Sequence, residues 1–204
     1  GANGSGQLGT GNTTTYYTAQ QVTGITTATD VAVGSLHTCA LLSDQTAKCW
    51  GSGPNGELGN SATGNSSSPV VVNNVSSAIS ITAGMYHSCV RLSDNTAKCW
   101  GYNAYGQIGD GTNTTPVSTP VAVPSLSNVE SISAGTYFTC VALTGGTAKC
   151  WGRNTEGNLG DGTTTTSYSP VTVSGLSNAS KVYVQGQYAK SFTCALLSDS
   201  TVKC

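Results

Sequence analysis

The stretch that decides the fold is a segment bounded by two cysteines, and it recurs four times along the chain. Its second copy reads Cys89-Val90-Arg91-Leu92-Ser93-Asp94-Asn95-Thr96-Ala97-Lys98-Cys99-Trp100-Gly101. The other copies are residues 39–51, 140–152 and 194–204. Each copy has a polar tip between its two cysteines, centred on Asp44, Asp94, Gly145 or Asp199. Short apolar runs on either side of such a tip predict a β-hairpin.

The cysteines of each copy fall opposite one another if the hairpin turns at this tip. Opposed residues on antiparallel strands have Cα atoms about 4.5–5.5 Å apart, which a disulfide can span. We therefore predict four bridges that use all the cysteines: Cys39–Cys49, Cys89–Cys99, Cys140–Cys150 and Cys194–Cys204. Zinc binding is the alternative, although zinc sites favour closely spaced cysteine pairs with histidine nearby.

The composition excludes several classes of partner. Charged residues make up 8% of the 204 residues, against about 25% in an average soluble protein. The net charge is −1, so we expect neither nucleic acid nor an anionic membrane surface as a partner. No apolar run approaches the ~18 residues of a membrane-spanning helix, and we expect no membrane insertion.

The cysteines also indicate a cellular location. Paired cysteines would be reduced in an ordinary cytosol, so we expect an extracellular protein, either secreted or on the cell surface. The chain begins at Gly1 inside a repeat, as a mature product or a fragment of a longer protein would. Five sequons are candidate glycosylation sites: Asn12, Asn65, Asn74, Asn113 and Asn178.

A long internal period organises the whole chain. Glycines that follow the repeated tryptophan position occur at Gly1, Gly51, Gly101 and Gly152, at intervals of about 50 residues. We read residues 1–204 as a single repeat array with repeats at about 1–50, 51–100, 101–151 and 152–204. Periods of this length are typical of propellers and solenoids.

Each repeat contains signals for four short strands and none for a helix. A glycine-rich loop is followed by a Ser/Thr-rich connection, a valine-rich strand beside proline, a strand of alternating polarity, and the cysteine hairpin. We predict an all-β fold: a β-propeller-type array of four four-stranded blades with one hairpin disulfide per blade. A β-solenoid ranks second, since it would have a shorter repeat and parallel strands.

Two adjoining motifs resemble the repeat of the regulator of chromosome condensation family. They are Gly84-Met85-Tyr86-His87-Ser88-Cys89-Val90-Arg91-Leu92 and Trp100-Gly101-Tyr102-Asn103-Ala104-Tyr105-Gly106-Gln107-Ile108-Gly109. The resemblance extends over all four repeats and implies a propeller. Propellers of this family usually contain more blades than the repeats present here, and the hairpin disulfide is not a general feature of the family.

Residues that recur in register are interpreted as scaffold. We assign this role to the lysine before each second cysteine, to the three tryptophans, and to His37 and His87, whose position holds Phe138 and Phe192 in later repeats. Asp110 and Asp161 lie in loops that lack the carboxylate pattern of a calcium site. We therefore predict no catalytic residue, no cofactor and no metal.

The aromatic residues of the loops, in contrast, differ from one repeat to the next. Tyrosine-rich loops on a rigid scaffold are suited to protein recognition. The candidate partner-binding residues are Tyr16, Tyr17, Tyr102, Tyr105 and Tyr168, with Tyr188 in a similar position.

We expect a non-enzymatic extracellular interaction or structural module with a protein partner, or one that self-associates. Relatives of the resembled family include a nuclear nucleotide-exchange factor and a secreted β-lactamase inhibitor, so the fold does not fix the activity. Residues 1–9 would either pack beside the fourth hairpin and close a four-bladed ring, or dock on that hairpin in a second subunit and form a ring or filament. The alternative is a secreted lyase or hydrolase with its site on the channel or loops, carried by an unrepeated acid such as Glu130 or Asp161.

Overall fold

The computed structural model describes residues 1–187 and 190–204, and the secondary structure of these residues consists of β-strands. The strands form four antiparallel sheets in which neighbours follow chain order. The first sheet contains β1 (Ala28–Val33), β2 (His37–Leu42), β3 (Ala47–Gly51) and β4 (Ser66–Val71). The second contains β5 (Ala78–Ala83), β6 (His87–Leu92), β7 (Ala97–Gly101) and β8 (Val117–Ala122).

The third sheet repeats this four-stranded plan, and the fourth repeats its first three strands. The third contains β9 (Val129–Ala134), β10 (Phe138–Leu143), β11 (Ala148–Gly152) and β12 (Ser167–Thr172). The fourth contains three strands, β13 (Ala179–Gln187), β14 (Lys190–Leu197) and β15 (Val202–Lys203). In the part of the chain that the structure describes, no helix is long and apolar enough to cross a membrane.

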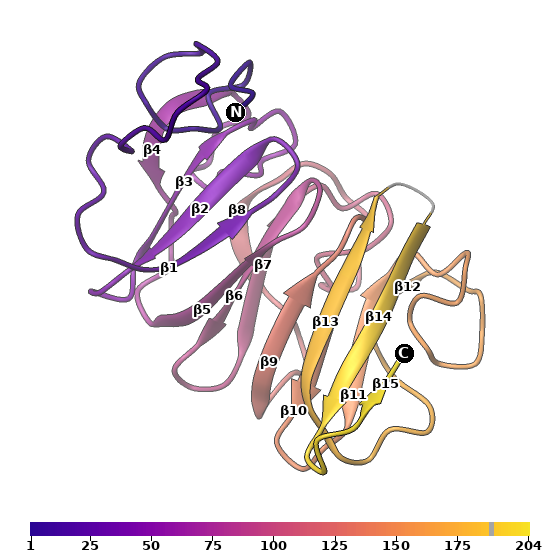
Figure 1. Ribbon diagram of the computed structural model, residues 1–204. Coiled ribbons are helices and arrows are strands. Elements are labelled where there is room, and N and C mark those ends of the chain that lie inside the picture. The colour runs from indigo at the N-terminus through magenta and orange to yellow at the C-terminus, as the bar shows by residue number, and fades with distance from the viewer. Residues whose placement is uncertain (188–189) are drawn as a thin grey trace.

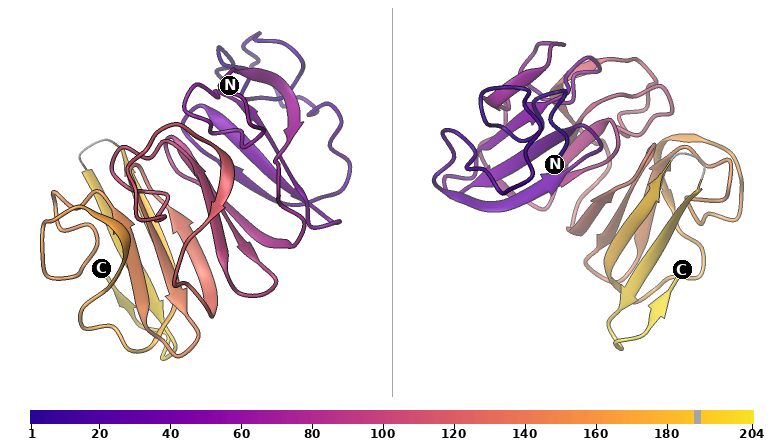
Figure 2. Two further views of the ribbon diagram at one scale, coloured as in Figure 1. Left: turned by 180° about the vertical axis from the view of Figure 1, so that it is seen from behind. Right: turned by 45° about the horizontal axis from the view of Figure 1, so that its top comes forward.

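The sheets lie side by side in chain order, like successive blades of a propeller (Figures 1 and 2). β5 contacts β1 and β2, β9 contacts β5 and β6, and β13 contacts β9 and β10. The first and fourth sheets lie at opposite ends of this row in both figures. The predicted all-β array of propeller blades with one disulfide per blade is confirmed.

The hairpin register brings the predicted cysteine pairs together. Cys39, Cys89 and Cys140 each lie directly opposite the second cysteine of their own hairpin. All four predicted disulfides are formed, with Cα–Cα distances of 4.0–4.1 Å. At the first tip the Asp44 carboxylate accepts hydrogen bonds from the Thr46 backbone N–H at 3.0 Å and the Thr46 hydroxyl at 2.6 Å. Local turn chemistry therefore fixes the register.

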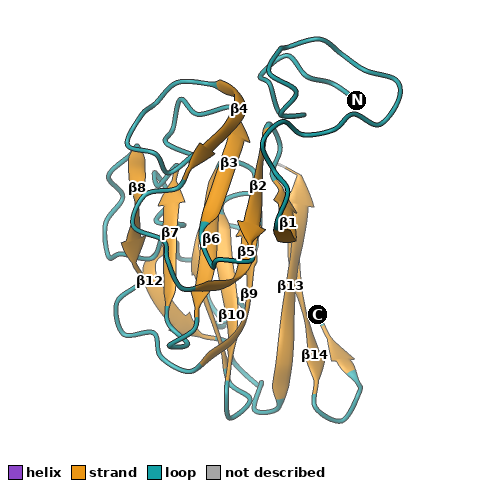
Figure 3. Ribbon diagram, turned by 90° about the vertical axis from the view of Figure 1, so that its left-hand side faces the viewer, coloured by secondary structure: helices purple, strands orange, loops and turns teal. Residues whose placement is uncertain are grey.

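Each complete sheet combines segments of two sequence repeats. The outermost strand β4 follows the glycine-rich loop at 51–59, yet it pairs with β3, which precedes that loop. Figure 3 shows the equivalent strands β4, β8 and β12 along one edge of the array. The corresponding residues 16–21 of the first repeat form no strand, because no earlier hairpin within the described chain is available to pair with them.

Buried polar contacts join neighbouring blades. His37 is 1% exposed, and its Nε2 lies 2.9 Å from Ser88 Oγ in the second sheet. His87 is completely buried, and its Nε2 lies 2.9 Å from Thr139 Oγ1 in the third sheet. Each histidine thus contacts a hydroxyl side chain on the second strand of the following blade.

The N-terminal loop packs on the first sheet. The Trp50 indole N–H donates to the Gln7 carbonyl at 2.9 Å, and the Thr38 hydroxyl donates to the same oxygen at 2.9 Å. Buried Asn3 holds the loop closed by donating to the Asn12 and Thr14 carbonyls. The expected alternative, in which residues 1–9 pack beside the fourth hairpin of the same chain, is therefore wrong, because the first sheet already provides their contacts.

Candidate protein-interaction site

Four tyrosines from the second and third repeats form one cluster, which we call the tyrosine cluster: Tyr86, Tyr102, Tyr105 and Tyr137. Tyr86 lies in the β5–β6 turn and Tyr137 in the β9–β10 turn, while the other two lie in the glycine-rich loop after β7. The Tyr102 backbone N–H donates to the Tyr86 carbonyl at 2.8 Å, which fixes the loop beside the turn.

The rings of the tyrosine cluster contact one another closely. The centroids of Tyr105 and Tyr137 are 5.0 Å apart, and those of Tyr86 and Tyr137 are 5.9 Å apart in a stacked arrangement. Tyr102 lies 6.1–6.4 Å from each of the other three rings. These separations fall within the range of about 4.5–7 Å in which aromatic pairs attract. Tyr105 retains 37% exposure, so the cluster presents an aromatic surface to solvent.

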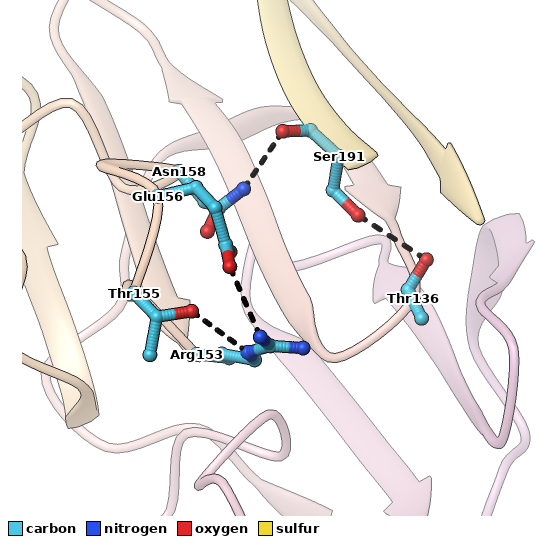
Figure 4. A network of polar contacts seen from close by, with 6 residues as sticks. All are labelled: Thr136, Arg153, Thr155, Glu156, Asn158 and Ser191. Atoms are coloured by element: carbon cyan, nitrogen blue, oxygen red, sulfur yellow. Dashed lines mark hydrogen bonds and ion pairs between the residues drawn. The ribbon is translucent and has the colours of Figure 1, made fainter. Parts of the chain in front are cut away.

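A charged side chain borders the tyrosine cluster. The Arg153 guanidinium carbon lies 5.9 Å from the Tyr105 ring centroid, within cation–π distance. The same guanidinium bonds Glu156 Oε1 at 3.0 Å and Thr155 Oγ1 at 2.9 Å (Figure 4). These contacts orient the arginine beside the ring, and the glutamate offsets its charge.

The tyrosine cluster is not repeated around the array. In the first repeat the positions of Tyr86, Tyr102 and Tyr105 are occupied by Leu36, Ser52 and Asn55. Scaffold positions recur in register, whereas this set of aromatic side chains occurs where the second and third blades meet. A unique constellation on a repeated scaffold is what specific recognition requires.

The structure brings together only some of the tyrosines predicted from the sequence. Tyr102 and Tyr105 are members of the cluster. Tyr16 and Tyr17 lie in the N-terminal loop, where Tyr17 is 97% exposed. Tyr168 lies at the start of β12 beside Gly106, with 40% exposure. Tyr188 lies outside the described residues.

Two members of the tyrosine cluster were not among the candidate residues predicted from the sequence. Tyr86 and Tyr137 precede His87 and Phe138, which occupy a repeated position that we interpreted as packing. The signal available in the sequence was an aromatic residue at the same turn position of two consecutive repeats. Their proximity to Tyr102 and Tyr105 depends on how the turns and loops of adjacent blades pack.

The candidate glycosylation sites remain predictions. Asn12, Asn65, Asn74 and Asn113 are exposed. Asn178 is partly buried, and its amide donates to the Asp199 carboxylate at 3.3 Å.

The carboxylates are held in separate local contacts. Glu130 is exposed on β9, and Asp161 accepts from Thr163 and Asn154 within its own loop. Glu57 is 1% exposed, and this burial raises the pKa of its carboxyl although hydrogen bonds from Asn55 oppose the shift. Among residues 1–187 and 190–204, no three His, Cys, Asp or Glu side chains are grouped to hold a metal ion.

The blades consist of antiparallel strands and lie in a row, each with a hairpin disulfide, and glycine-rich loops connect them. This arrangement defines a β-propeller repeat protein. The sequence profile described as Regulator of chromosome condensation (RCC1) repeat matches residues 1–41, 49–91, 99–142 and 147–196. A second profile of the same description matches 28–57, 78–107 and 129–158. The chain belongs to the RCC1 repeat family.

Solved structures share this fold. The crystal structure of human WBSCR16 superposes with a TM-score of 0.79 at 20% identity, covering 98% of this chain and 54% of that one. Yeast RCC1 (Prp20), crystallised with Kap60, gives a TM-score of 0.72 at 20% identity and covers 82% and 42% of the two chains. The chain thus spans about half the length of these structures. Among curated proteins, no sequence matches it significantly.

Proposed function

We propose that this chain is a non-enzymatic, extracellular protein-interaction module, and that the tyrosine cluster is its contact surface. Tyrosine and arginine are the residue types enriched at binding hot spots, and both are present here. Four disulfides support the extracellular location, because such bonds persist in oxidising compartments. The lack of repetition in the cluster is the observation on which the proposal rests.

One structurally similar protein, yeast Prp20, is described in two crystal structures as binding other proteins. Yeast RCC1 (Prp20) was crystallised with Kap60, and Prp20p was studied for its binding to Gsp1p and histones. Those partners belong to that protein, and the low identity transfers only the fold. They support the use of RCC1-repeat propellers as protein-binding scaffolds.

Replacing Tyr105 with alanine is expected to weaken partner binding about tenfold or more, since a truncated hot-spot aromatic costs at least about 1.4 kcal/mol. The measurement is capture of proteins from native extracellular fluid on immobilised chain, followed by titration of the captured partner. Tyr168→Ala is the matched control, because Tyr168 has similar exposure outside the cluster. Unchanged affinity in Tyr105→Ala, or equal loss in both variants, would contradict the proposed surface.

Self-association is a second candidate function, favoured by the exposed ends of the array. Val31 on β1 is 59% exposed, whereas Ile81, Ile132 and Val182 at the equivalent positions are 3–8% exposed. At the other end, Phe192 on β14 is 58% exposed. Its equivalents His37, His87 and Phe138 are at most 1% exposed, because each is covered by the following blade.

The two exposed end faces are equivalent to the two surfaces that meet where neighbouring blades pack together. In a head-to-tail pair, the Phe192 face of one subunit would cover the Val31 face of the next. Residues 16–21 of the second subunit would then lie where β4, β8 and β12 lie in the complete sheets, beside β15. Such a heterologous contact closes into a ring if the rotation permits and otherwise continues as a filament.

Light scattering across a concentration series is expected to give masses above the 20.6 kDa of one chain. Val31→Lys should return the mass to that of one chain, because it places a charge in the contact. Val71→Lys is the matched control, since Val71 is 55% exposed on the outer strand of the first sheet. A mass of 20.6 kDa at every concentration would eliminate the head-to-tail arrangement.

A further inference from the structure

The rings of the tyrosine cluster are tilted against one another. Tyr137 lies at the centre, with its ring centroid within 6.1 Å of the other three. Its plane makes an angle of 27° with that of Tyr86, 54° with that of Tyr105 and 56° with that of Tyr102. Tilted rings present both faces and edges, so a partner meets several short aromatic surfaces instead of one plane.

The segments that carry the cluster are hydrogen-bonded to one another. The Tyr102 N–H donates to the Tyr86 carbonyl at 2.8 Å, and the Arg153 N–H donates to the Tyr137 carbonyl at 2.9 Å. These backbone groups bond within the scaffold, so the contacts with a partner fall to the side chains. A surface that is already formed avoids part of the ordering cost of binding.

The side chains at the border of the cluster are hydrogen-bond donors. Tyr105 is 37% exposed and carries a phenolic O–H, and the Arg153 guanidinium carries several N–H groups. Two hydrogen bonds from this guanidinium go to Thr155 and Glu156 (Figure 4), and its other N–H groups can serve a ligand. The Glu156 carboxylate is paired with the same arginine at 3.0 Å. The site therefore combines aromatic surface and donors with a balanced charge, and it favours an uncharged ligand rich in acceptors.

A polyproline II segment has the complementary chemistry. Its backbone makes no internal hydrogen bonds, so its carbonyls are available as acceptors. Proline also has no backbone N–H that would need an acceptor. In an α-helix, by contrast, the carbonyls are bonded within the helix. A helix packed on the cluster would therefore bury the donors of Tyr105 and Arg153 without partners, which is costly.

We propose that the tyrosine cluster binds a proline-rich segment of its protein partner in the polyproline II conformation. Proline rings pack on the tyrosine rings, and peptide carbonyls accept hydrogen bonds from the Tyr105 hydroxyl and the Arg153 guanidinium. This inference rests on the proposed function, since it names the class of partner for the same surface. Aromatic-lined sites recognise proline-rich segments because the segment is already extended and loses little conformational freedom on binding.

Titration of the ¹⁵N-labelled chain with acetylated and amidated L-decaproline tests the proposal. Amide shift changes should centre on residues 86, 102–106, 137 and 153. The dissociation constant should be on the order of 100 μM, because a short peptide covers less surface than a standard protein interface. D-decaproline has the same composition and the opposite helix hand. It should bind about tenfold more weakly, since its carbonyls cannot align with the same donors.

Tyr105→Phe keeps the aromatic ring and removes the hydroxyl. It should weaken L-decaproline binding about two- to tenfold, which is the effect of losing one hydrogen bond. Tyr168→Phe is the matched control, because Tyr168 is 40% exposed outside the cluster, and it should bind like the unsubstituted chain. Equal affinity for the two decaproline enantiomers, shifts centred elsewhere, or equal loss in both variants would overturn the proposal.

Competition separates this inference from the proposed function. L-Decaproline should displace the partner that the immobilised chain captures from extracellular fluid. Failure of L-decaproline to bind, while Tyr105→Ala still weakens capture of the partner, would show the inference to be wrong and leave the proposed function standing. Binding of an alanine-rich helical peptide or of cellohexaose to the cluster in place of L-decaproline would also overturn the inference.

Discussion

Reduction of the four disulfides is expected to unfold the chain under conditions in which the oxidised protein is fully folded. Each bridge joins cysteines separated by 10 residues, and the chain-entropy relation gives about 3 kcal/mol for a loop of this size. Four such contributions total on the order of 10 kcal/mol, which is comparable with the whole stability of a typical domain, about 5–15 kcal/mol.

Thermal unfolding followed by circular dichroism, with and without a thiol reductant, checks this expectation. The terminal Cys194–Cys204 pair should be reduced first, because Cys204 is exposed and Cys194 is only partly buried. The Cys89–Cys99 pair is completely buried, as Cys39–Cys49 is, and should resist reduction for longer than the terminal pair. Removing it by the double change Cys89→Ser and Cys99→Ser should cost more stability than the same change at 194 and 204. A reduced chain that melts at the oxidised temperature would contradict the prediction.

Acidification from pH 7 to pH 4 is expected to destabilise the fold through its two buried histidines. Burial lowers the pKa of His37 from 6.5 to about 4. Burial, with a smaller effect of His37, lowers the pKa of His87 from 6.5 to about 3. Between these values the unfolded chain binds protons that the folded chain does not, so stability falls as the pH drops below about 6.5. A shift of this size corresponds to on the order of 3 kcal/mol per buried histidine.

The double variant His37→Phe, His87→Phe isolates this contribution. The third repeat already holds Phe138 at the same position, 1% exposed, so phenylalanine fits this site. The free energy of unfolding, measured by denaturant titration between pH 7 and pH 4, should vary less with pH in the double variant. Equal pH dependence in both proteins would rule out the histidines as its source.

Other groups titrate with distinguishable effects. Hydrogen bonds from Thr46 and Thr96 lower the pKa of Asp44 and Asp94, so their contribution is lost only as the pH falls below about 3.8. Burial raises the pKa of Glu57, so its contribution has the opposite sign and is lost as the pH rises above 4.5. Both effects are common to the parent protein and the double variant and cancel in the comparison.

Only half of the tyrosine cluster, the proposed interaction site, was predictable from the sequence. Tyr102 and Tyr105 stood out because they interrupt a glycine-rich loop that recurs in every repeat. Tyr86 and Tyr137 are 51 residues apart in the chain, and their stacking depends on the packing of neighbouring turns. The sequence holds no direct signal for such a distance.

The sequence by itself determined the hairpins, their disulfides and the propeller class. These features depend on contacts within about ten residues or on a pattern repeated along the chain, such as the Asp44–Thr46 turn and the opposed Cys39 and Cys49. Only the tertiary structure decided that each complete blade combines strands of two sequence repeats. It also decided which blade faces stay exposed and which loop tyrosines contact one another. Val31 and Ile81 occupy equivalent repeat positions, but their burial differs because a neighbouring blade covers only one of them.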